Sequence, residues 1–435
     1  MNSNIICNLY NNSIMTSISS EVIANDKVRQ IINSEYTDND FLELMKEITK
    51  DSVKNNNFYK KLLLDTQYKS KEIDEIEDLS DLPYIPASYF KQSANNFRRL
   101  LKIPEKSSEF KTWNVSSCTT GDPSLVGRSI EDIEVLASMT IRCIYDFIPI
   151  PKEQWDNTLA FNFSPKVSFL NKLAFRYTDV RPVSLYSSNL HKISTRMSNP
   201  HFLIKFRFLK AIKEIILRGK LVGAFTIDSK FVIRKIQKNM EKPLEDQKYV
   251  SFGGSLQLLN NFMNSYLEDN SIRFDLPNSV VNVGGGGWSG HKSQLKYPPI
   301  DKAQFVSDCL DYLGTKKENI TDMYGFTETP IVFGSHWSEK YQDFIFHTPP
   351  QARIILRDIS TQEPLETIGE RGFLEVLTPF GVHASINHAI LIDDVVELVG
   401  THKCPECGYE GAAFIVYGRI KDQKGLGCSS TVEWI

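Results

Sequence analysis

Several residues that could donate hydrogen bonds to phosphate crowd one short turn, WNVSSCTTGDPSLVGRS, at positions 113–129. These residues are Ser116, Ser117, Thr119, Thr120, Gly121 and Arg128. A polyphosphate needs many hydroxyl, backbone N–H or cationic donors at short range, and such a turn can present them. The stretch therefore indicates a phosphate-binding loop, although an ordinary Ser/Thr turn explains the same composition. It is not a Walker-type loop, because the Gly-Lys-Ser/Thr ending is missing.

Two later stretches carry groups that suit a nucleotide. The glycine run from Gly284 to Gly287 follows the apolar residues VVNV and would let a flat ring or a ribose approach the backbone. A flexible loop explains this run nearly as well, and it meets the dinucleotide-binding spacing only trivially. In DMYGFTETP, Tyr324, Thr327 and Glu328 bring a ring, a hydroxyl and a carboxylate within five positions. These groups can stack on a base, contact phosphate and hold Mg²⁺, respectively.

The cysteines raise two further questions of chemistry. Cys428 lies in GLGCSS, where Gly425 and Gly427 free the backbone close to the last residue. A thiol in that setting could be delivered to a reaction partner, whereas a free cysteine is more often an idle buried side chain. Cys404 and Cys407 form one Cys-x-x-Cys turn, which supplies half of the four ligands of a structural zinc site.

Histidines could complete that zinc site. The candidates in the sequence are His402 together with His388 or His383. A reduced structural turn is the alternative explanation for the two cysteines. A redox role is less favoured, because the surrounding pattern does not resemble a thioredoxin-like unit.

The elements that must position these groups alternate between helix and strand. Apolar spacing predicts helices over 38–65, 129–148 and 200–220, and short strands over 221–227, 279–285 and 319–325. Such alternation predicts an α/β fold with crossover helices. After about residue 350 strand-like runs dominate. We therefore expect a leader over 1–37, an α/β core over 38–350 and a β-rich subdomain over 351–435 that carries Cys428 on a short arm.

Composition excludes several classes of protein. The chain has 435 residues, 41% hydrophobic and 24% charged, with a formal net charge of −3, so nothing in the charge balance favours nucleic acid. No apolar run approaches the roughly 20 residues that cross a bilayer. Seven cysteines, an odd number spread over the chain, fit reduced thiols better than a disulfide framework. We expect a cytoplasmic protein.

Taken in order, the motifs resemble those of adenylate-forming ligases. The ordered set is SSCTTGDPS, GGGGW, YGFTE, TQEPLETIGERGFLEV, the Asp of LIDDVVEL and the Arg of YGRIKD. Within that superfamily the chain resembles the acyl-protein synthetase (LuxE) family of bacterial fatty-acid reductase complexes. Supporting features are LPYIPASYFK before the first motif, a Ser after TTGDP where Lys is usual, and a chain that stops soon after YGRI. The resemblance covers roughly residues 38–435 and implies an adenylation core without a full mobile C-terminal lid.

The resemblance also implies roles for individual residues. The nucleotide-binding set comprises the six donors of the first motif with Gly285, Gly286, Gly287, Tyr324, Gly325, Asp394 and Arg419. Thr327 corresponds to the α-phosphate contact, Glu328 to the Mg²⁺ ligand and Cys428 to the cysteine that becomes acylated. Asp393 is the alternative candidate for the position assigned to Asp394. Two departures stand out, since Cys118 replaces a usual glycine and Ser289 stands where a lysine is expected.

The function that follows from the resemblance is ATP-dependent activation of a carboxylic acid, such as a fatty acid, to an acyl-AMP. The acyl group would then pass to Cys428 as a thioester for delivery to a partner such as an acyl reductase. ATP and Mg²⁺ are the expected cofactors, with Zn²⁺ as a further candidate at the Cys-x-x-Cys turn. The alternatives are an acyl-CoA or acyl-carrier-protein ligase, and a catalytically silent homologue that acts as a binding subunit.

Overall fold

The structure is a computed structural model. It describes residues 36–65, 73–116, 122–166, 178–207, 216, 225–289, 291–292, 295–296 and 298–419. The predicted leader over 1–37, apart from its last two residues, and the predicted arm with Cys428 lie outside these ranges.

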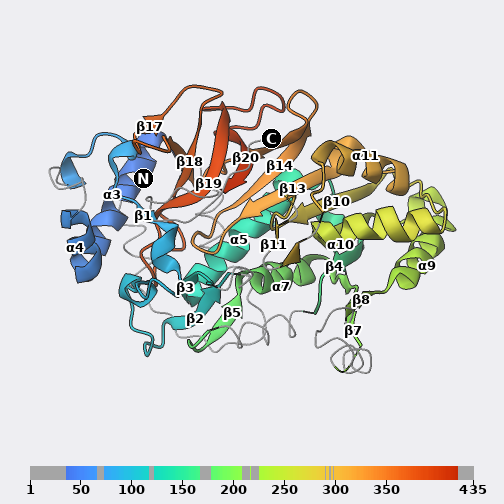
Figure 1. Cartoon of the computed structure of the whole chain (residues 1–435), viewed down its shortest axis with the longest axis horizontal. Coiled ribbons are helices and arrows are strands. Elements are labelled where there is room, and N and C mark those ends of the chain that lie inside the picture. Colours follow the sequence, from blue (N-terminus) through green and yellow to red (C-terminus); the bar gives the residue numbers. More distant parts are fainter. Residues whose placement is uncertain are drawn as a thin grey trace.

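A thirteen-stranded mixed sheet runs through the molecule (Figure 1). Its strand order is β17 (Pro364–Leu365), β16 (Arg353–Arg357), β18 (Arg371–Leu377), β19 (Ala389–Gly400), β20 (Ala413–Arg419), β15 (Asp343–His347), β14 (Val332–Ser338), β13 (Ile320–Gly325), β10 (Ser279–Gly284), β9 (Val250–Ser255), β4 (Leu159–Phe163) and β6 (His201–Phe202), while β1 (Ile85–Pro86) pairs with β19. The strands from β6 to β13 are parallel, and those from β13 to β17 are antiparallel.

Smaller sheets flank this one. A three-stranded sheet has the order β3 (Leu125–Ser129), β2 (Phe110–Val115) and β5 (Val183–Leu185), and two-stranded ribbons are formed by β7 (Ile204–Phe206) with β8 (Phe225–Ile227) and by β11 (His291–Lys292) with β12 (Leu295–Lys296).

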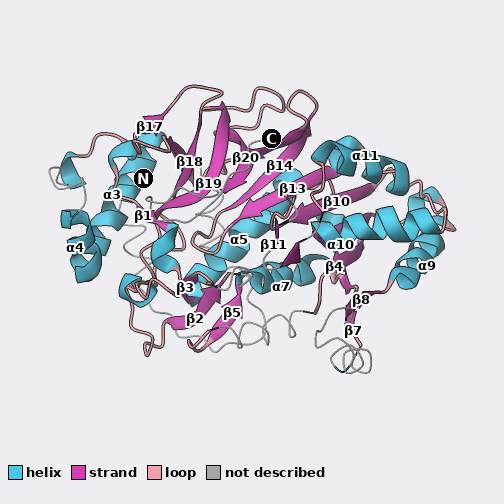
Figure 2. Ribbon diagram, viewed as in Figure 1, coloured by secondary structure: helices cyan, strands magenta, loops and turns pink. Residues whose placement is uncertain are grey.

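Helices lie beside both halves of the large sheet: most flank the parallel half, while those formed by residues 38–65 lie next to β17, β18 and β1 of the antiparallel half (Figure 2). The helices are α3 (Asp38–Asn55), α4 (Asn57–Asp65), α5 (Ile130–Phe147), α7 (Tyr186–Ser198), α9 (Ser229–Met240), α10 (Leu256–Asn261), the π-helical segment Phe262–Leu267 that continues α10, and α11 (Lys302–Leu313). Short 3₁₀ turns occupy Ile73–Glu75, Leu79–Asp81, Ala87–Phe90, Phe97–Leu100, Lys152–Gln154, Leu244–Asp246 and Lys317–Asn319.

The starts of the helices follow from local sequence. At α5 the Ser129 side chain accepts from the Asp132 N–H, and the Asp132 carboxylate accepts from the Ser129 N–H, so two otherwise unpaired donors are satisfied. Thr37 and Asp40 form the same arrangement at α3. The α5 prediction over 129–148 is confirmed, and the helix predicted over 38–65 is present as α3 and α4, interrupted at Asn56.

One predicted helix is wrong in its first part. Residues 200–220 have helical apolar spacing, yet the structure has strands β6 and β7 between His201 and Phe206. The reason is tertiary, since β6 extends the parallel sheet by pairing Phe161 with His201 and Phe163 is buried beside it. Sheet pairing and burial outweigh a weak helical preference over so few residues.

The predicted change of pattern near residue 350 agrees with the structure, since every strand after His347 is antiparallel to its neighbours in the large sheet, apart from the parallel contact of β19 with β1. The largest hydrophobic cluster of the described residues runs under both halves and includes Phe161, Val281, Phe333 and Ile390, all at most 1% exposed. No described helix combines the length and apolar character that a membrane span requires.

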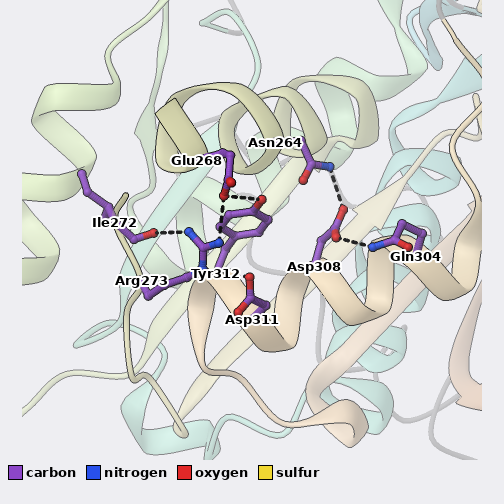
Figure 3. Close-up of polar contacts among 8 residues, drawn as sticks. All are labelled: Asn264, Glu268, Ile272, Arg273, Gln304, Asp308, Asp311 and Tyr312. Atoms are coloured by element: carbon purple, nitrogen blue, oxygen red, sulfur yellow. Dashed lines mark hydrogen bonds and ion pairs between the residues drawn. The ribbon is translucent and has the colours of Figure 1, made fainter. Parts of the chain in front are cut away.

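Polar contacts fix the outer helices of the parallel half (Figure 3). The Tyr312 hydroxyl on α11 donates to the Glu268 carboxylate at 2.9 Å, and Arg273 bridges Glu268 to Asp311 at 2.8 Å on each side. Asn264 donates to Asp308, which ties the π-helical segment to α11. The Arg273, Glu268 and Asp311 side chains of this network are exposed, so it holds these helices together at the surface.

Candidate functional site

The glycine run and the Tyr324 motif meet at one edge of the sheet. Strands β10 and β13 are parallel neighbours with Gly284 opposite Met323, so the residues that follow each strand leave at the same edge. In open α/β sheets this carboxyl edge is where ligands bind. Gly285, Gly286 and Gly287 have φ of 78°, 65° and 103°, a region that disfavours side chains.

Space around the glycine loop differs from one residue to the next. A Cβ on Gly286 would meet nothing within 4 Å, whereas one on Gly287 would lie 2.0 Å from Gln257 Nε2. The Gln257 amide donates to the Gly287 carbonyl at 2.7 Å, so the loop is held on one side and open at Gly286. This agrees with the expectation that a ring or ribose can approach the backbone.

The exit of the glycine loop is tied to β13. Trp288 donates its indole N–H to the Asp322 carboxylate at 2.9 Å and packs against Phe305 and Phe344. Asp322 is buried, and burial raises its pKa to about 7 although the Trp288 hydrogen bond and Lys302 act in the opposite direction. The residue that ends the glycine loop is therefore held by a carboxyl group two residues before Tyr324.

Tyr324 reaches across to the antiparallel half of the sheet. Its hydroxyl donates to the Asp394 carboxylate on β19 at 2.6 Å. In the register of β19 and β20, Asp394 lies opposite Arg419. Three residues that the sequence assigns to the nucleotide, from three different strands, are thus adjacent. Only the backbone position of Arg419 is described, so the role of its side chain stays a prediction.

The Tyr324 ring is set by aromatic packing. Ring centroids of Phe326, Phe333, Phe346 and Phe414 lie 5.6 to 6.3 Å from it. Such tilted and edge contacts fix a ring more firmly than apolar contact alone. The hydroxyl is therefore presented to Asp394 by a rigid cluster rather than by the hydrogen bond itself.

Thr327 and Glu328 follow β13 and are both buried. The Arg128 guanidinium donates to the Thr327 carbonyl at 3.0 Å and to the Gly381 carbonyl at 2.8 Å. The Asn387 amide donates to the Glu328 carbonyl at 2.9 Å. The backbone that presents the Thr327 hydroxyl and the Glu328 carboxylate is thus fixed from β3 and from the β18–β19 connection.

Arg128 has partners that the sequence did not predict. It is 1% exposed, and burial lowers the pKa of its guanidinium, while Asp132, Tyr186 and Glu328 favour the charged form. Its contact with phosphate stays a prediction. What the structure does show is a buried cation that positions the Thr327 carbonyl.

Glu328 fits the expected Mg²⁺ ligand in the chemistry of its donor. Mg²⁺ prefers oxygen ligands and commonly uses one or two carboxylates together with substrate phosphates. Among the described residues, no cluster of three or more metal-ligating side chains includes Glu328. The role of Glu328 as the Mg²⁺ ligand stays a prediction.

The predicted phosphate loop connects β2 to β3. Its two ends are tied together, because the Ser116 N–H donates to the Ser124 carbonyl and the Ser124 N–H donates to the Ser116 hydroxyl, both at 3.0 Å. Asp122 accepts from the backbone and hydroxyl of Ser93. The remaining predicted donors lie outside the described residues, namely Ser117, Thr119, Thr120 and Gly121.

Three residues near the site were missed from the sequence. They are Gln257 and Asn387, described above, and Tyr186 at the start of α7. The Tyr186 hydroxyl would lie 2.9 Å from a Cβ on Gly325, and burial raises the pKa of this phenol. No local signal marks Tyr186, because its role depends on contact with Gly325, 139 positions away along the chain.

The Cys-x-x-Cys turn has histidines beside it, but not those suggested by the sequence. His336 and His347 lie with Cys404 and Cys407 in one cluster. His388 instead contacts the Tyr59 hydroxyl at 3.3 Å, the backbone N–H of His383 donates to Asp132, and His402 is exposed. Expecting His402, His388 or His383 as ligands was therefore wrong, because pairing of β14 with β15 brings more distant residues to the turn.

Comparisons with known proteins identify a family and a fold for this chain. The sequence model of the family described as "Acyl-protein synthetase, LuxE" matches residues 223–434. No curated protein sequence matches the chain. The match confirms the LuxE resemblance recognised from the sequence motifs.

Solved structures show the same fold. An open form of 2-hydroxyisobutyryl-CoA ligase in complex with 2-HIB-AMP and CoA has a TM-score of 0.56 and 14% identity, covering 88% of this chain and 70% of that one. The postadenylation state of that ligase with R3-HIB-AMP has a TM-score of 0.56 and 13% identity, covering 88% and 68%. The chain therefore has the adenylate-forming ligase fold, and the predicted fold class is confirmed.

Proposed function

We propose that this chain is an AMP-forming ligase that activates a carboxylic acid with ATP and then transfers the acyl group to its own Cys428. The observation that carries the proposal is the contact of Tyr324 with Asp394, opposite Arg419, beside the open glycine loop. These are the positions that the LuxE resemblance assigns to the nucleotide, and the family match and the fold support the same activity.

The first step would join the acid to the nucleotide. A carboxylate oxygen attacks the α-phosphorus of ATP, a new O–P bond forms, and pyrophosphate leaves. Thr327 would contact the α-phosphate, and Glu328 would hold Mg²⁺, which offsets the repulsion between carboxylate and triphosphate. The hydrogen bonds from Arg128 and Asn387 to the carbonyls of these two residues hold their backbone in place.

The second step would move the acyl group to sulfur. The Cys428 thiolate attacks the acyl carbon, the bond to AMP breaks, and a thioester remains on the protein. Cys428 lies nine positions after Arg419, and a chain of that length can span up to about 30 Å. Because Arg419 pairs with Asp394 in the site, this tether is long enough to bring the thiol to the acyl-AMP.

The test separates the two steps. The full chain is incubated with ATP, Mg²⁺ and a panel of radiolabelled carboxylic acids of increasing chain length. We expect acid-dependent ATP–pyrophosphate exchange and a hydroxylamine-sensitive label on the protein. Cys428→Ser should abolish the label and retain exchange, whereas Cys7→Ser, a control at the other end of the chain, should retain both. Label that persists on the Cys428→Ser protein would refute the cysteine role.

The same experiment tests the final acceptor. We propose a fatty acid as the substrate and an acyl reductase as the partner that removes the acyl group from Cys428. A reductase supplied with labelled protein and a reduced nicotinamide cofactor should then release an aldehyde. Retention of all label on the protein would contradict that partner.

A second candidate is favoured by the structural comparison. The structurally similar 2-hydroxyisobutyryl-CoA ligase was solved in complex with CoA, which favours an external thiol as the acceptor. That function predicts acyl-CoA as product and equal rates for the wild type and Cys428→Ser. ATP binding without exchange for any acid would instead indicate a silent homologue.

A further inference from the structure

Four metal-ligating side chains from separate parts of the antiparallel half meet behind the nucleotide site. His336 lies on β14, His347 on β15, and Cys404 and Cys407 in the connection from β19 to β20. One ligand atom from each lies within 4.8 Å of all the others. We propose that these four residues bind a structural zinc ion. The site is independent of the proposed ligase function.

The distances approach those of a tetrahedral site. With Zn–N of about 2.05 Å and Zn–S of about 2.3 Å, tetrahedral angles place N and S about 3.6 Å apart and two nitrogens about 3.4 Å apart. His347 Nε2 lies 3.6 Å from Cys407 Sγ and 2.8 Å from His336 Nδ1. Binding therefore requires the two imidazoles to separate by roughly half an ångström, which is a small side-chain movement.

The cysteine turn is built to present both sulfurs on one side. The Cys404 N–H donates to the Tyr409 carbonyl at 2.9 Å, and the Gly408 N–H donates to the Cys404 carbonyl at 3.1 Å. Gly408 has a φ of 76°, which a residue with a side chain would adopt only with strain. A tight turn closed by glycine brings Cys404 and Cys407 together without a disulfide.

The histidines are oriented by neighbours. His336 Nε2 faces the Glu406 carboxylate at 3.6 Å, and Glu406 accepts from the Ser338 hydroxyl at 2.7 Å. A carboxylate behind the second ring nitrogen is the usual way in which a ligating histidine is held. The His347 ring stacks on Phe147 of α5 with centroids 5.2 Å apart, so it is fixed from the opposite side.

The two sulfur and two nitrogen ligands favour zinc over Mg²⁺, the other metal expected in this chain. Two thiolates and two imidazoles form the closed four-ligand set of a structural zinc site, whereas Mg²⁺ requires oxygen. The cluster also lies on the other face of the sheet from Tyr324. Phe346 contacts the Tyr324 ring, and the neighbouring His347 points away from it because successive side chains in a strand alternate.

A structural zinc ion would therefore hold two strands and one connecting turn together. It would join β14 and β15 to the turn that precedes β20, and β20 is the strand that leads to Arg419. Its effect should fall on the stability of the antiparallel half rather than on the chemical step.

The experiment measures metal in the full chain. Protein produced in zinc-supplemented medium is dialysed and analysed by mass spectrometry for zinc, and we expect about one zinc per chain. Cys404→Ser and Cys407→Ser should each lower the content at least fivefold. His402→Ala, which changes an exposed histidine two residues before Cys404, is the matched control and should retain the wild-type content.

A second measurement does not depend on the variants folding. Wild-type protein stripped with a chelator is titrated with Co²⁺, and four-coordinate thiolate ligation should give strong visible absorption bands that saturate near one equivalent. Less than about 0.2 zinc per chain together with no cobalt bands would overturn the proposal. Wild-type zinc content in both cysteine variants would overturn it as well.

Discussion

Because Tyr324 contacts Asp394 through its hydroxyl, the proposed nucleotide site can be tested by removing a single oxygen atom. Tyr324→Phe removes the hydroxyl that lies 2.6 Å from the Asp394 carboxylate. The four phenylalanine rings around Tyr324 would hold the phenylalanine ring in the same place. Any effect therefore reports the hydrogen bond rather than a loss of packing.

The magnitude follows from the charge and exposure of the partner. A hydrogen bond to a charged group contributes about 1.5–3 kcal/mol. Asp394 is only partly buried, so water can replace the lost hydroxyl and the lower value applies. If the oriented carboxylate contacts the ribose, about 1.5 kcal/mol corresponds to a roughly tenfold increase in the dissociation constant for ATP.

The assay is ATP binding by calorimetry, which does not require the acid to be known. Tyr312→Phe is the matched control, because it removes another tyrosine hydroxyl that donates to a carboxylate, here at 2.9 Å on the outer helices (Figure 3). We expect Tyr312→Phe to leave ATP affinity unchanged.

A double-mutant cycle provides the decisive comparison. If Tyr324 acts through Asp394, Tyr324→Phe should cost nothing further in an Asp394→Ala background. An equal loss of affinity in both backgrounds, or unchanged ATP affinity in Tyr324→Phe itself, would refute the reasoning.

Two further predictions concern the groups that support the site. Asp322 has a pKa of about 7 when folded and near 3.8 when unfolded, so between these values the folded chain retains a proton that the unfolded chain releases, and stability falls as pH rises. Asp322→Asn keeps an acceptor for the Trp288 indole N–H and should remove this pH dependence of the unfolding free energy, measured by urea denaturation. We expect the variant to be more stable than the wild type by up to about 4 kcal/mol at pH 8 and by little at pH 4. The same pH dependence in both proteins would contradict this prediction. Arg128→Met leaves the carbonyls of Thr327 and Gly381 without their donor and should cost about 2–4 kcal/mol of unfolding free energy. A loss no greater than that of the surface variant Arg273→Met would show that these contacts contribute little.

Much of the architecture could be predicted because it depends on local pattern. The α5 helix has its own capping residues, and β13 and β19 are apolar runs bounded by turn residues. The positions of Tyr324 and Asp394 could be assigned by motif, but not the hydrogen bond between them. That bond depends on the strand order β13, β14, β15, β20 and β19 in the sheet. The sequence of a single segment does not predict this order.

The contacts that escaped prediction join residues far apart in the sequence. Arg128 contacts the carbonyl of a residue 199 positions away, and carbonyls carry no sequence signal. His336 and His347 are adjacent only because the β14–β15 register pairs Gly334 with His347 and His336 with Ile345. A shift of either strand by one residue would turn its histidine to the other face, so the metal-ligating set could not be chosen before the register was known.

Because of this register, the two faces of the antiparallel half of the sheet have different roles. Phe333, Phe346 and Phe414 face Tyr324, while their immediate neighbours Gly334, His347 and Ala413 face α5 and the cysteine turn. One face thus orders the candidate nucleotide site, and the other holds the strands together through the proposed zinc ion. Because the two faces share only backbone, removing zinc should lower stability well before it alters ATP affinity. An equal and simultaneous loss of both would mean that the two faces are not separable in this way.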